Sequence, residues 1–546
     1  MRSPRNTNTF YKADTKTWIG SRTPPLYNPN QSLGELILAI LKKTPTKITQ
    51  ISADSGAKVT CSEMRLRSIR IAQNLTAMGY TQQDVFAMAV RNGELVAPTI
   101  FACFALGIPV NTLDGTFKHD EFSPMLENIK PKLIFCDQES LAEMQLAIKL
   151  AAIDPVVIVF GEKVDGYLHI EQLIKPTGRE HEFIPVHLDD ASSKLAIIIC
   201  SSGTTGRSKG VCLSHSICIA SMASMLDYEP TDITLAFSSL YWLSGLAFLI
   251  LGTVSGATRI IVRQPFEPAL ALSIIERYRV SAAFFPPANA VALLKHPRMA
   301  TTDLSSIRLW LSGGAMVSTE MKRSFEALTP TASFIIGYGM SEVGGLVALS
   351  DDDSYKDGST GYLRASCQAK VVDNAGNVLD IGQEGEILVK LDYIFSGYYG
   401  NTKATAEMLD DAGWLHTGDI GRFDEDGILF ILDRKKDIIK YNNYQISPSE
   451  IERFIQQIPG VANVSVAGVP VPGNELPAAL VVKTSTARIT EDDIHQTVER
   501  NLSNYKQLRG GVYFTEALPM TPSGKVVRRK CLDIMVQLYN NVNALK

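Results

Sequence analysis

The stretch IIICSSGTTGRSKGV, residues 197–211, decides how the rest of the chain is interpreted. Residues 195–200 form a continuous apolar, β-branched run, which predicts a strand buried inside a sheet. The residues that follow are hydroxyl-rich and glycine-rich, so they cannot belong to a core. Glycines let backbone N–H groups approach an oxyanion closely, while hydroxyls and a lysine add donors and a positive charge. The sequence therefore predicts a polyphosphate-binding loop after a buried strand. Its members are Ser201, Ser202, Gly203, Thr204, Thr205, Gly206 and Lys209.

Three other interpretations of this loop have to be weighed. A Walker P-loop needs four residues between its glycines and a hydroxyl residue after its lysine, whereas here only two residues separate Gly203 from Gly206 and Gly210 follows Lys209. Residues 206–210 fit the G-x-S-x-G pattern of a nucleophile elbow, but the predicted strand ends well before Ser208. A flexible Gly/Ser linker is the third possibility, and the buried strand before the loop and the basic pair inside it argue against a linker.

Composition limits the class of protein. The 546 residues have the apolar and charged fractions of an ordinary globular protein, 45% and 20%, and room for about three or four domain-sized units. A net charge of −4 gives no basic footprint for nucleic acid, so we expect small-molecule partners. Eight cysteines without a C-x-x-C pair suggest neither a zinc site nor a disulfide framework. The first residues lack the apolar core of a secretory signal, which favours the cytoplasm.

Residues 233–258 contain no charged residue over 26 positions, which is long enough to span a bilayer. Serines and glycines divide this stretch into shorter apolar pieces. We therefore expect a buried strand, a turn and a helix there, and no transmembrane segment.

Helical and strand patterns alternate along most of the chain. Residues 65–78 have helical spacing and are followed by Gly79, a stop signal, while residues 84–90, 133–136 and 156–160 are typical of strands. This alternation predicts an α/β body. The dense charge cluster at 433–437 is typical of a solvated turn.

The phosphate loop and several later segments resemble, in order, the signature motifs of the adenylate-forming superfamily. This superfamily includes acyl-CoA synthetases, coumarate ligases, beetle luciferases and non-ribosomal adenylation domains. The later segments are LSGGA at 311–315, IIGYGMSE at 335–342, GWLHTGD at 413–419, the stretch 439–452 and PMTPSGK at 519–525. The chain has Ser208 where the family usually has proline, and Ser341 where threonine is commoner.

The resemblance implies an α/β fold with a large multi-sheet N-terminal body, built from sandwiched sheets and a small β-barrel, and a small mobile α+β C-terminal lid. Residues 1–434 would form the AMP-binding domain and residues 435–546 the lid. The hinge would lie near 434–437, with Lys436 as the hinge residue.

The resemblance also assigns roles to single residues. Glu342 would hold Mg²⁺, as expected for a hard cation that bridges phosphates, and Lys525, Ser341 and Lys209 would complete the catalytic set. A carboxylate at Asp419 would accept both ribose hydroxyls. Besides the phosphate loop, the implied ATP and AMP contacts are Gly313, Gly314, Ala315, Gly337, Tyr338, Gly339, Met340, Ser341, Asp419, Arg434, Gln445 and Lys525.

Coenzyme A and the acyl chain have their own implied contacts. Lys436, Lys440, Asn442 and Asn443 would belong to the hinge and the CoA site, although most relatives carry glycine in place of Asn443. Trp242 stands where many relatives have a histidine and resembles the aromatic gate of some long-chain acyl-CoA synthetases; a tryptophan buried in the core is the alternative. Gly344 and Gly345 would leave room beside it.

Together these features predict an ATP-dependent acid-thiol ligase. It would adenylate a carboxylic acid, which we expect to be a medium-chain or long-chain fatty acid, release pyrophosphate and transfer the acyl group to CoA. The alternatives are a luciferase-type monooxygenase and a lipid-binding relative without catalysis. Cytoplasm is the expected compartment; the peroxisome, where several relatives lie, is the alternative, although Ala544-Leu545-Lys546 is not an S-K-L signal.

Overall fold

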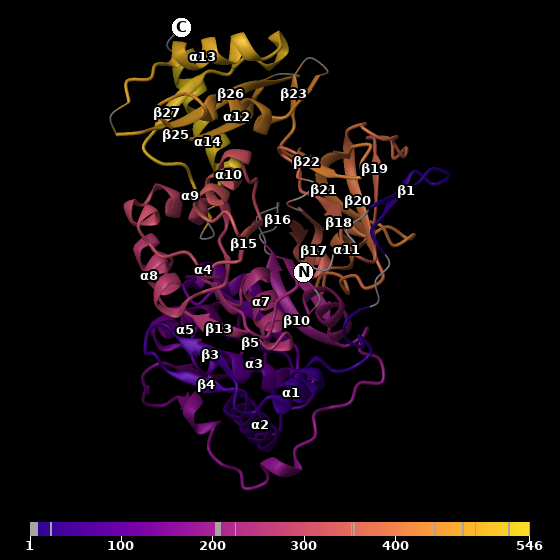
Figure 1. Ribbon diagram of the computed structural model, residues 1–546, viewed down its shortest axis with the longest axis vertical. Helices are drawn as coiled ribbons and strands as arrows, with labels where there is room; N and C mark the ends of the chain where they lie inside the picture. Colours follow the sequence, from indigo (N-terminus) through magenta and orange to yellow (C-terminus); the bar gives the residue numbers. More distant parts are fainter. Residues whose placement is uncertain are drawn as a thin grey trace.

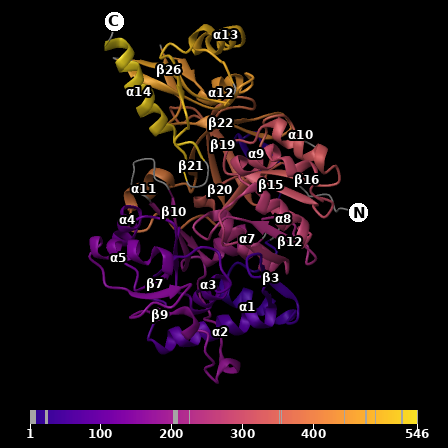
Figure 2. The ribbon, with the colours of Figure 1, turned by 90° about the vertical axis from the view of Figure 1, so that its left-hand side faces the viewer.

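The computed structural model describes residues 9–21, 25–201, 209–223, 225–350, 352, 355–441, 444–471, 474–485, 487–521 and 525–544. Three large sheets and their helices form a body, and two small sheets with three helices form a separate group above it (Figures 1 and 2). This is the mixed α/β architecture, a large N-terminal body with a smaller C-terminal domain, that the sequence predicts.

The first sheet of the body carries the predicted phosphate loop. Its order is β11-β10-β6-β5-β7-β8-β9, and only the β10–β11 pair is antiparallel. The strands are β5 (Phe86–Ala89), β6 (Val110–Leu113), β7 (Leu133–Asp137), β8 (Val156–Phe160), β9 (Leu168–His169), β10 (Leu195–Ser201) and β11 (Lys209–Ser214). The four strands expected from apolar runs are thus confirmed, because such runs are what a parallel sheet buried on both faces requires.

The second sheet has nine strands in the order β18-β17-β16-β15-β14-β12-β13-β3-β4. Its inner strands, from β16 to β3, are parallel, and antiparallel strands lie at both edges. The strands are β3 (Ile48–Ser52), β4 (Lys58–Thr60), β12 (Ile233–Ala236), β13 (Thr258–Ile261), β14 (Ala282–Phe284), β15 (Leu309–Gly313), β16 (Ser333–Met340), β17 (Gly345–Leu349) and β18 (Tyr362–Leu363).

Helices separate and cover these two sheets. The layer between them shares one apolar core with both sheets and contains α1 (Leu33–Lys43), α2 (Cys61–Ala77), α3 (Val96–Leu106) and α7 (Leu243–Val254). The outer face of the seven-stranded sheet packs on α4 (His119–Ile129) and α5 (Leu141–Leu150). The outer face of the nine-stranded sheet packs on α8 (Pro268–Tyr278), α9 (Pro287–Lys295) and α10 (Thr319–Leu328).

Two sequence predictions can be compared with these helices. The helix expected at 65–78 begins earlier, at Cys61, because Thr60 and Glu63 form a capping box at its N-terminus. Gly79 follows it with a φ of +90°, as a helix stop requires. The uncharged stretch at 233–258 forms β12, a turn and α7, as expected. None of the helices in the described part of the chain is long and apolar enough to cross a membrane.

The third sheet of the body is antiparallel throughout, with the order β1-β2-β19-β20-β21-β22. It stands where a small β-barrel was expected, and α11 (Thr402–Met408) packs against β21. The strands are β1 (Phe10–Lys12), β2 (Thr17–Ile19), β19 (Cys367–Val372), β20 (Gly385–Leu391), β21 (Leu415–Phe423) and β22 (Leu429–Arg434).

The elements after Arg434 form the C-terminal group at the top of Figure 1. One small sheet pairs β23 (Ile439–Tyr441) with β24 (Tyr444–Ile446), and the other contains β25 (Val461–Val471), β26 (Asn474–Lys483) and β27 (Val512–Thr515). The helices are α12 (Pro448–Gln456), α13 (Glu491–Asn501) and α14 (Arg528–Ala544). Their apolar side chains form cores of their own. The predicted division after residue 434 stays a prediction.

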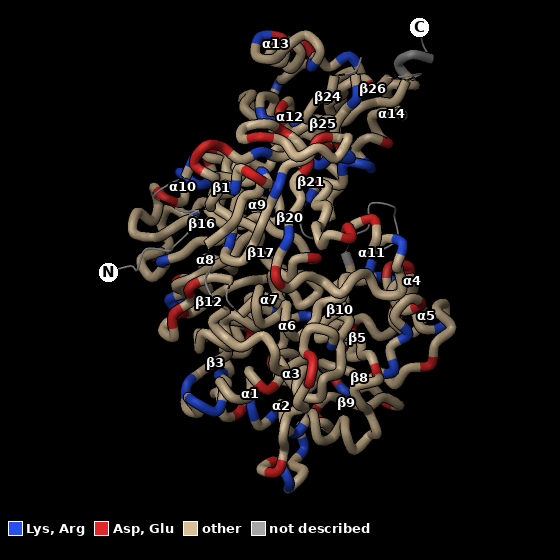
Figure 3. The backbone as a smooth tube through the Cα atoms, turned by 90° about the vertical axis from the view of Figure 1, so that its right-hand side faces the viewer, with Lys and Arg blue, Asp and Glu red and all other residues tan. Residues whose placement is uncertain are grey.

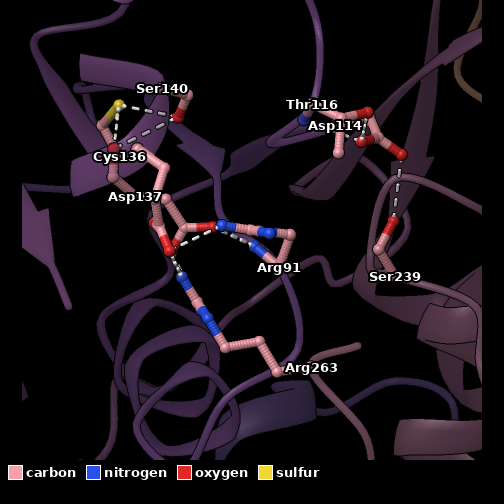
Figure 4. Close-up of polar contacts among 9 residues, drawn as sticks. Arg91, Asp114, Thr116, Cys136, Asp137, Ser140, Ser239 and Arg263 are labelled. Atoms are coloured by element: carbon pink, nitrogen blue, oxygen red, sulfur yellow. Dashed lines mark hydrogen bonds and ion pairs between the residues drawn. The ribbon is translucent and has the colours of Figure 1, made fainter. Parts of the chain in front are cut away.

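A buried carboxylate ties the two large sheets of the body together (Figure 4). Asp137, at the end of β7, accepts hydrogen bonds from the backbone N–H of Arg91 at 2.8 Å and from Nη1 of Arg263 at 3.2 Å. Arg91 follows β5 of the first sheet and Arg263 follows β13 of the second. Both arginines also pair with Glu139, so two positive and two negative groups compensate one another. This cluster is an internal structural connection.

Candidate active site

Strand β16 carries the central residues of the candidate site. It ends at Met340, and a 3₁₀ turn at Ser341–Val343 then reverses the chain into β17. The reversal needs glycine twice. A Cβ on Gly339 would lie 2.1 Å from the carbonyl oxygen of Gly345, and Gly344 has a φ of +62°. The result is that Tyr338 and Glu342 are held at fixed places on one short hairpin.

The first cluster of the site gathers around Asp419. Its carboxylate is only 4% exposed and accepts a hydrogen bond of 2.6 Å from the Tyr338 hydroxyl. Arg434 lies opposite it in the β21–β22 ladder, with 2.8 Å between Nε and the carboxylate. Burial raises the pKa of Asp419, although the guanidinium of Arg434 and the Tyr338 hydroxyl both favour its charged form. Asp419 lies inside a strand, so the alternative of an aspartate that merely closes a turn does not apply.

Lys525 comes to this cluster from the C-terminal group. A Cβ atom on Gly314 would lie 3.8 Å from both the Cε and the Nζ atom of Lys525. Lys525 keeps access to solvent, and its pKa is lowered by the surrounding protein and by the positive charge of Arg434, against the opposing effect of Asp419. Gly314 follows the end of β15 with a φ of +86°. Elements far apart in the sequence therefore meet at the carboxyl ends of β15 and β16, the edge where ligands bind in parallel sheets.

The second cluster gathers around Glu342, whose side chain is 6% exposed. The hydroxyl of Tyr398 donates a 2.7 Å hydrogen bond to its Oε1 atom. The Nζ atom of Lys209 lies 4.8 Å from the centre of the Tyr398 ring. Tyr398 is a residue that the sequence analysis missed. Only the sequence SGYYG at 396–400 offered a signal, and a glycine-flanked aromatic pair is too common to identify a site.

The phosphate loop is described only at its ends. Ser201 and Lys209 are paired across the β10–β11 ladder, so the two ends of the loop lie side by side. Lys209 opens β11 instead of lying in the loop itself. The predicted loop residues Ser202, Gly203, Thr204, Thr205 and Gly206 lie outside the described residues.

The remaining predicted nucleotide contacts lie along the same strand ends. Gly313 ends β15, and a Cβ there would lie 2.4 Å from the carbonyl oxygen of Gly337 in β16, so both strands approach closely only because residue 313 is a glycine. Ala315 is exposed after Gly314, while Met340 and Ser341 are partly buried at the end of β16.

The predicted hinge and CoA residues follow Arg434 in the turn after β22 and in the β23–β24 hairpin. Lys436 is exposed in the turn closed by the Asp437 N–H and the Arg434 carbonyl, at 2.9 Å. Lys440 is exposed in β23, where it is paired with Gln445 of β24. Asn442 and Asn443 lie outside the described residues.

The predicted acyl-pocket residues are divided between two places. Trp242 is partly buried at the start of α7 and makes an edge-to-face contact with Tyr241, with 4.8 Å between ring centres. A Cβ on Gly344 would lie 2.9 Å from Ile217, and one on Gly345 would lie 3.6 Å from Ser221. The space above these two glycines is therefore filled by the segment that follows β11.

Comparison with known proteins agrees with this arrangement. The sequence model of the family "AMP-binding enzyme" matches residues 39–399, and that of the "AMP-binding enzyme C-terminal domain" matches residues 450–525. The chain is 31% identical over 543 residues to 4-coumarate–CoA ligase 1 of Arabidopsis thaliana, covering 96% of this chain and 95% of that protein.

Two solved structures share the fold. The luciferase-like enzyme from the nonluminescent mealworm Zophobas morio has a TM-score of 0.72 and 32% identity, over 76% of this chain and 98% of that one. ATP-bound MatB from Rhodopseudomonas palustris has a TM-score of 0.83 and 27% identity, over 93% of this chain and 99% of that one. With both family segments matched in order and a relative 31% identical over nearly the whole chain, the chain belongs to the adenylate-forming family of AMP-binding enzymes, as an AMP-forming acid–CoA ligase.

Proposed function

We propose that this protein adenylates a medium-chain or long-chain fatty acid and transfers the acyl group to CoA. A carboxylate oxygen attacks the α-phosphorus of ATP, the bond from that phosphorus to the bridging oxygen breaks, and pyrophosphate leaves. The CoA thiol then loses its proton and attacks the acyl carbon, so that AMP leaves. The observation that carries the proposal is the approach of Lys525 to Gly314, beside the Asp419–Arg434 pair.

In this proposal the first cluster binds the nucleoside. The Asp419 carboxylate accepts hydrogen bonds from the ribose hydroxyls, and its ion pair with Arg434 holds it in place. The ring of Tyr338 packs against adenine, while the bare backbone at Gly313 and Gly314 gives the flat base room to approach. Lys525 then faces the phosphates, where its positive charge offsets the negative charge that develops during attack.

The second cluster suits a magnesium ion that arrives with ATP. The described residues contain no group of three or more metal-ligating side chains, so the ion would need phosphate oxygens and water as its other ligands. Mg²⁺ at phosphate sites takes only one or two carboxylates, and Glu342 provides one whose Oε1 atom is already oriented by Tyr398. When bound, the ion would neutralise charge on the phosphates. Ser341 and Lys209 would contribute a hydroxyl and a positive charge beside it.

Within this proposal, the fatty-acid substrate rests on Trp242 at the start of α7, which resembles the aromatic gate of some long-chain acyl-CoA synthetases. A cavity of about 20 Å³ lies beneath this helix, and its lining includes Ser238, Gly245 and Phe248. That volume holds about one water molecule, so it is too small for an acyl chain, and Trp242 is not among its lining residues. Trp242 is partly buried at the start of α7, where a change of its side-chain rotamer would act as a gate. We therefore propose that Trp242 controls entry of the acyl chain.

Substrate-dependent ATP–pyrophosphate exchange tests this function. The panel should contain fatty acids of graded length, 4-coumarate because of the coumarate–CoA ligase relative, and luciferin. We expect exchange with a fatty acid and release of AMP and an acyl-CoA after CoA is added. Exchange with 4-coumarate alone would overturn the fatty-acid substrate, and light emission with luciferin would favour the luciferase alternative. Nucleotide binding without exchange for any acid would favour a non-catalytic relative.

The compartment and the CoA site are part of the same proposal. We propose that the protein acts in the cytoplasm, with the peroxisome as the alternative, and that Lys436, Lys440, Asn442, Asn443 and Gln445 approach the site after the lid rotates. No nucleic-acid partner is proposed.

A further inference from the structure

Tyr398 connects the two sides of the proposed adenylation site. The segment around it runs beside β11, the strand that begins with Lys209. The Cys212 N–H donates to the Gly397 carbonyl at 3.0 Å, and the Tyr399 N–H donates to the Gly210 carbonyl at 2.8 Å. Gly397 has a φ of +93°, and the Tyr398 N–H is bonded to Thr405 at 2.9 Å. The backbone of Tyr398 is therefore fixed relative to the strand that follows the phosphate loop.

The same segment is fixed to the turn that carries Glu342. The Phe395 N–H donates to the backbone carbonyl of Glu342 at 3.2 Å, and the Tyr398 hydroxyl donates to its carboxylate at 2.7 Å. The Tyr398 side chain is 5% exposed, so few alternative rotamers or water partners are open to it.

The ring of Tyr398 has a second contact. Lys209 lies over the ring with 4.8 Å between Nζ and the ring centre, a distance at which a cation is attracted by the aromatic face. One buried side chain thus touches both the carboxylate and a lysine that the proposed function assigns to metal and phosphate. The hydroxyl contacts Glu342 and the ring face contacts Lys209, so the two contacts can be removed separately.

We propose that Tyr398 is the positioning residue of the phosphate–metal site, orienting the Glu342 carboxylate through its hydroxyl and the Lys209 ammonium through its ring. This inference rests on the proposed function. A hydrogen bond to Oε1 leaves Oε2 to face a cation, and Mg²⁺ needs such orientation because it demands near-ideal octahedral geometry. Partners that orient a metal ligand typically change metal affinity about 10- to 100-fold when they are removed.

The experiment measures binding, without turnover, of α,β-methylene-ATP, in which the bond that adenylation breaks is blocked. The affinity for the analogue is measured by calorimetry with Mn²⁺ and again with EDTA. The ratio of the two affinities reports the part of binding that depends on the metal. Tyr398→Phe should lower this ratio about tenfold and leave the EDTA value unchanged, because the ring beneath Lys209 remains. Tyr398→Leu should weaken the EDTA value as well, because the aromatic face is lost.

Tyr399→Phe is the matched control. It removes the hydroxyl of the neighbouring tyrosine, whose side chain packs beside Cys212 and Ile198 instead of contacting Glu342 or Lys209. Its affinities for the analogue, with Mn²⁺ and with EDTA, should both match those of the wild type. An unchanged ratio in Tyr398→Phe, or an equal loss with Mn²⁺ and with EDTA, overturns the inference. Failure of the wild type to bind the analogue at all overturns the proposed function instead. If Tyr398→Leu does not fold, the Phe variant alone decides.

Discussion

Lys525 is the residue on which the proposed adenylation step depends most. It is exposed in the C-terminal group yet reaches Gly314 and the Asp419 cluster in the body. Nothing in the sequence around Lys525 distinguishes it from a solvated lysine in a Pro/Gly turn, so its position was predicted by the resemblance alone. The structure adds the physical reason for a role, because the C-terminal group brings this cation beside Gly314 and the Asp419–Arg434 pair of the body.

Replacing Lys525 by alanine should slow adenylation about 100- to 1,000-fold, as the loss of one aligned charge typically does. Thioester formation from a supplied acyl-adenylate should continue at the wild-type rate, because pyrophosphate has already left. Rapid-quench measurement of acyl-AMP and of acyl-CoA separates the two steps. Lys530→Ala removes an exposed lysine from α14 and serves as the control. Wild-type adenylation by Lys525→Ala would contradict the assignment.

The pH dependence of adenylation should follow the charge of Lys525. Its pKa in the folded protein is lowered, first because the surrounding protein displaces water from one side of the exposed lysine and then by the positive charge of Arg434, against the opposing effect of Asp419. The ammonium exists only below that pKa, so the rate should fall as the pH rises, beginning below the ordinary lysine value of about 10.4. A pH series of ATP–pyrophosphate exchange measures this alkaline limb. The limb should be absent from thioester formation with supplied acyl-adenylate; its presence in both steps would assign it to another group.

At the scale of elements, the strands and the order of the motifs could be predicted because they depend on local patterns. Apolar runs predicted the positions of β5, β7, β8 and β10. The contact of Tyr398 with Glu342 could not be predicted, because it depends on the pairing of residues 396–399 with β11. Likewise, the surroundings of Gly344 depend on Ile217, which belongs to a different part of the chain.

Hydrogen bonds between residues on the two sides of the β22–β23 turn cross the predicted hinge. Asp433 is buried, and its Oδ2 atom accepts from the Ser447 hydroxyl at 2.8 Å and from the Ser449 N–H at 3.0 Å. Ser447 is the N-cap of α12. Lys436 lies between these partners, so rotation about it must separate Asp433 from Ser447. The present arrangement of the lid is therefore stabilised by these bonds.

Asp433→Ala should shift the lid away from the present arrangement. Hydrogen bonds to a charged group contribute about 1.5–3 kcal/mol, so adenylation should slow about tenfold or more. The thioester step from supplied acyl-adenylate should be unchanged or faster. Asp533→Ala removes an exposed carboxylate from α14, outside the predicted hinge, and serves as the control. An equal loss in both half-reactions of Asp433→Ala would contradict a role in the hinge equilibrium.

Proline at Lys436 is a less direct test of the same hinge. Lys436 is the third residue of the turn from Arg434 to Asp437, whose closing bond is 2.9 Å. Proline there would fix φ, remove the backbone N–H and restrict the conformation of the residue before it. Such a variant would disturb the present arrangement of the lid as well as its rotation. A change in both half-reactions would therefore not show which of the two was altered.

At the scale of the whole molecule, the site is divided between the body and the C-terminal group (Figures 1 and 2). Charges of both signs are mixed along the chain, consistent with the net charge of −4 (Figure 3). The two parts are joined by the exposed turn at residues 435–437 and meet again where Lys525 approaches Gly314. A ligand that contacts both parts should therefore reduce the freedom of the turn that joins them.

Limited proteolysis with trypsin should report this coupling. Lys435 and Lys436 are exposed in the connecting turn and are trypsin sites, although Lys435 is paired with Glu386 at 2.7 Å. A non-hydrolysable acyl-adenylate analogue should slow cleavage there, because a ligand that binds only the closed arrangement lowers the open population by mass action, about 100-fold at 100 times its dissociation constant. Lys525→Ala should show weaker protection at the same saturation, since one contact across the two parts is missing. Equal protection of both proteins, measured by mass spectrometry of the fragments, would mean that the closed arrangement does not depend on Lys525.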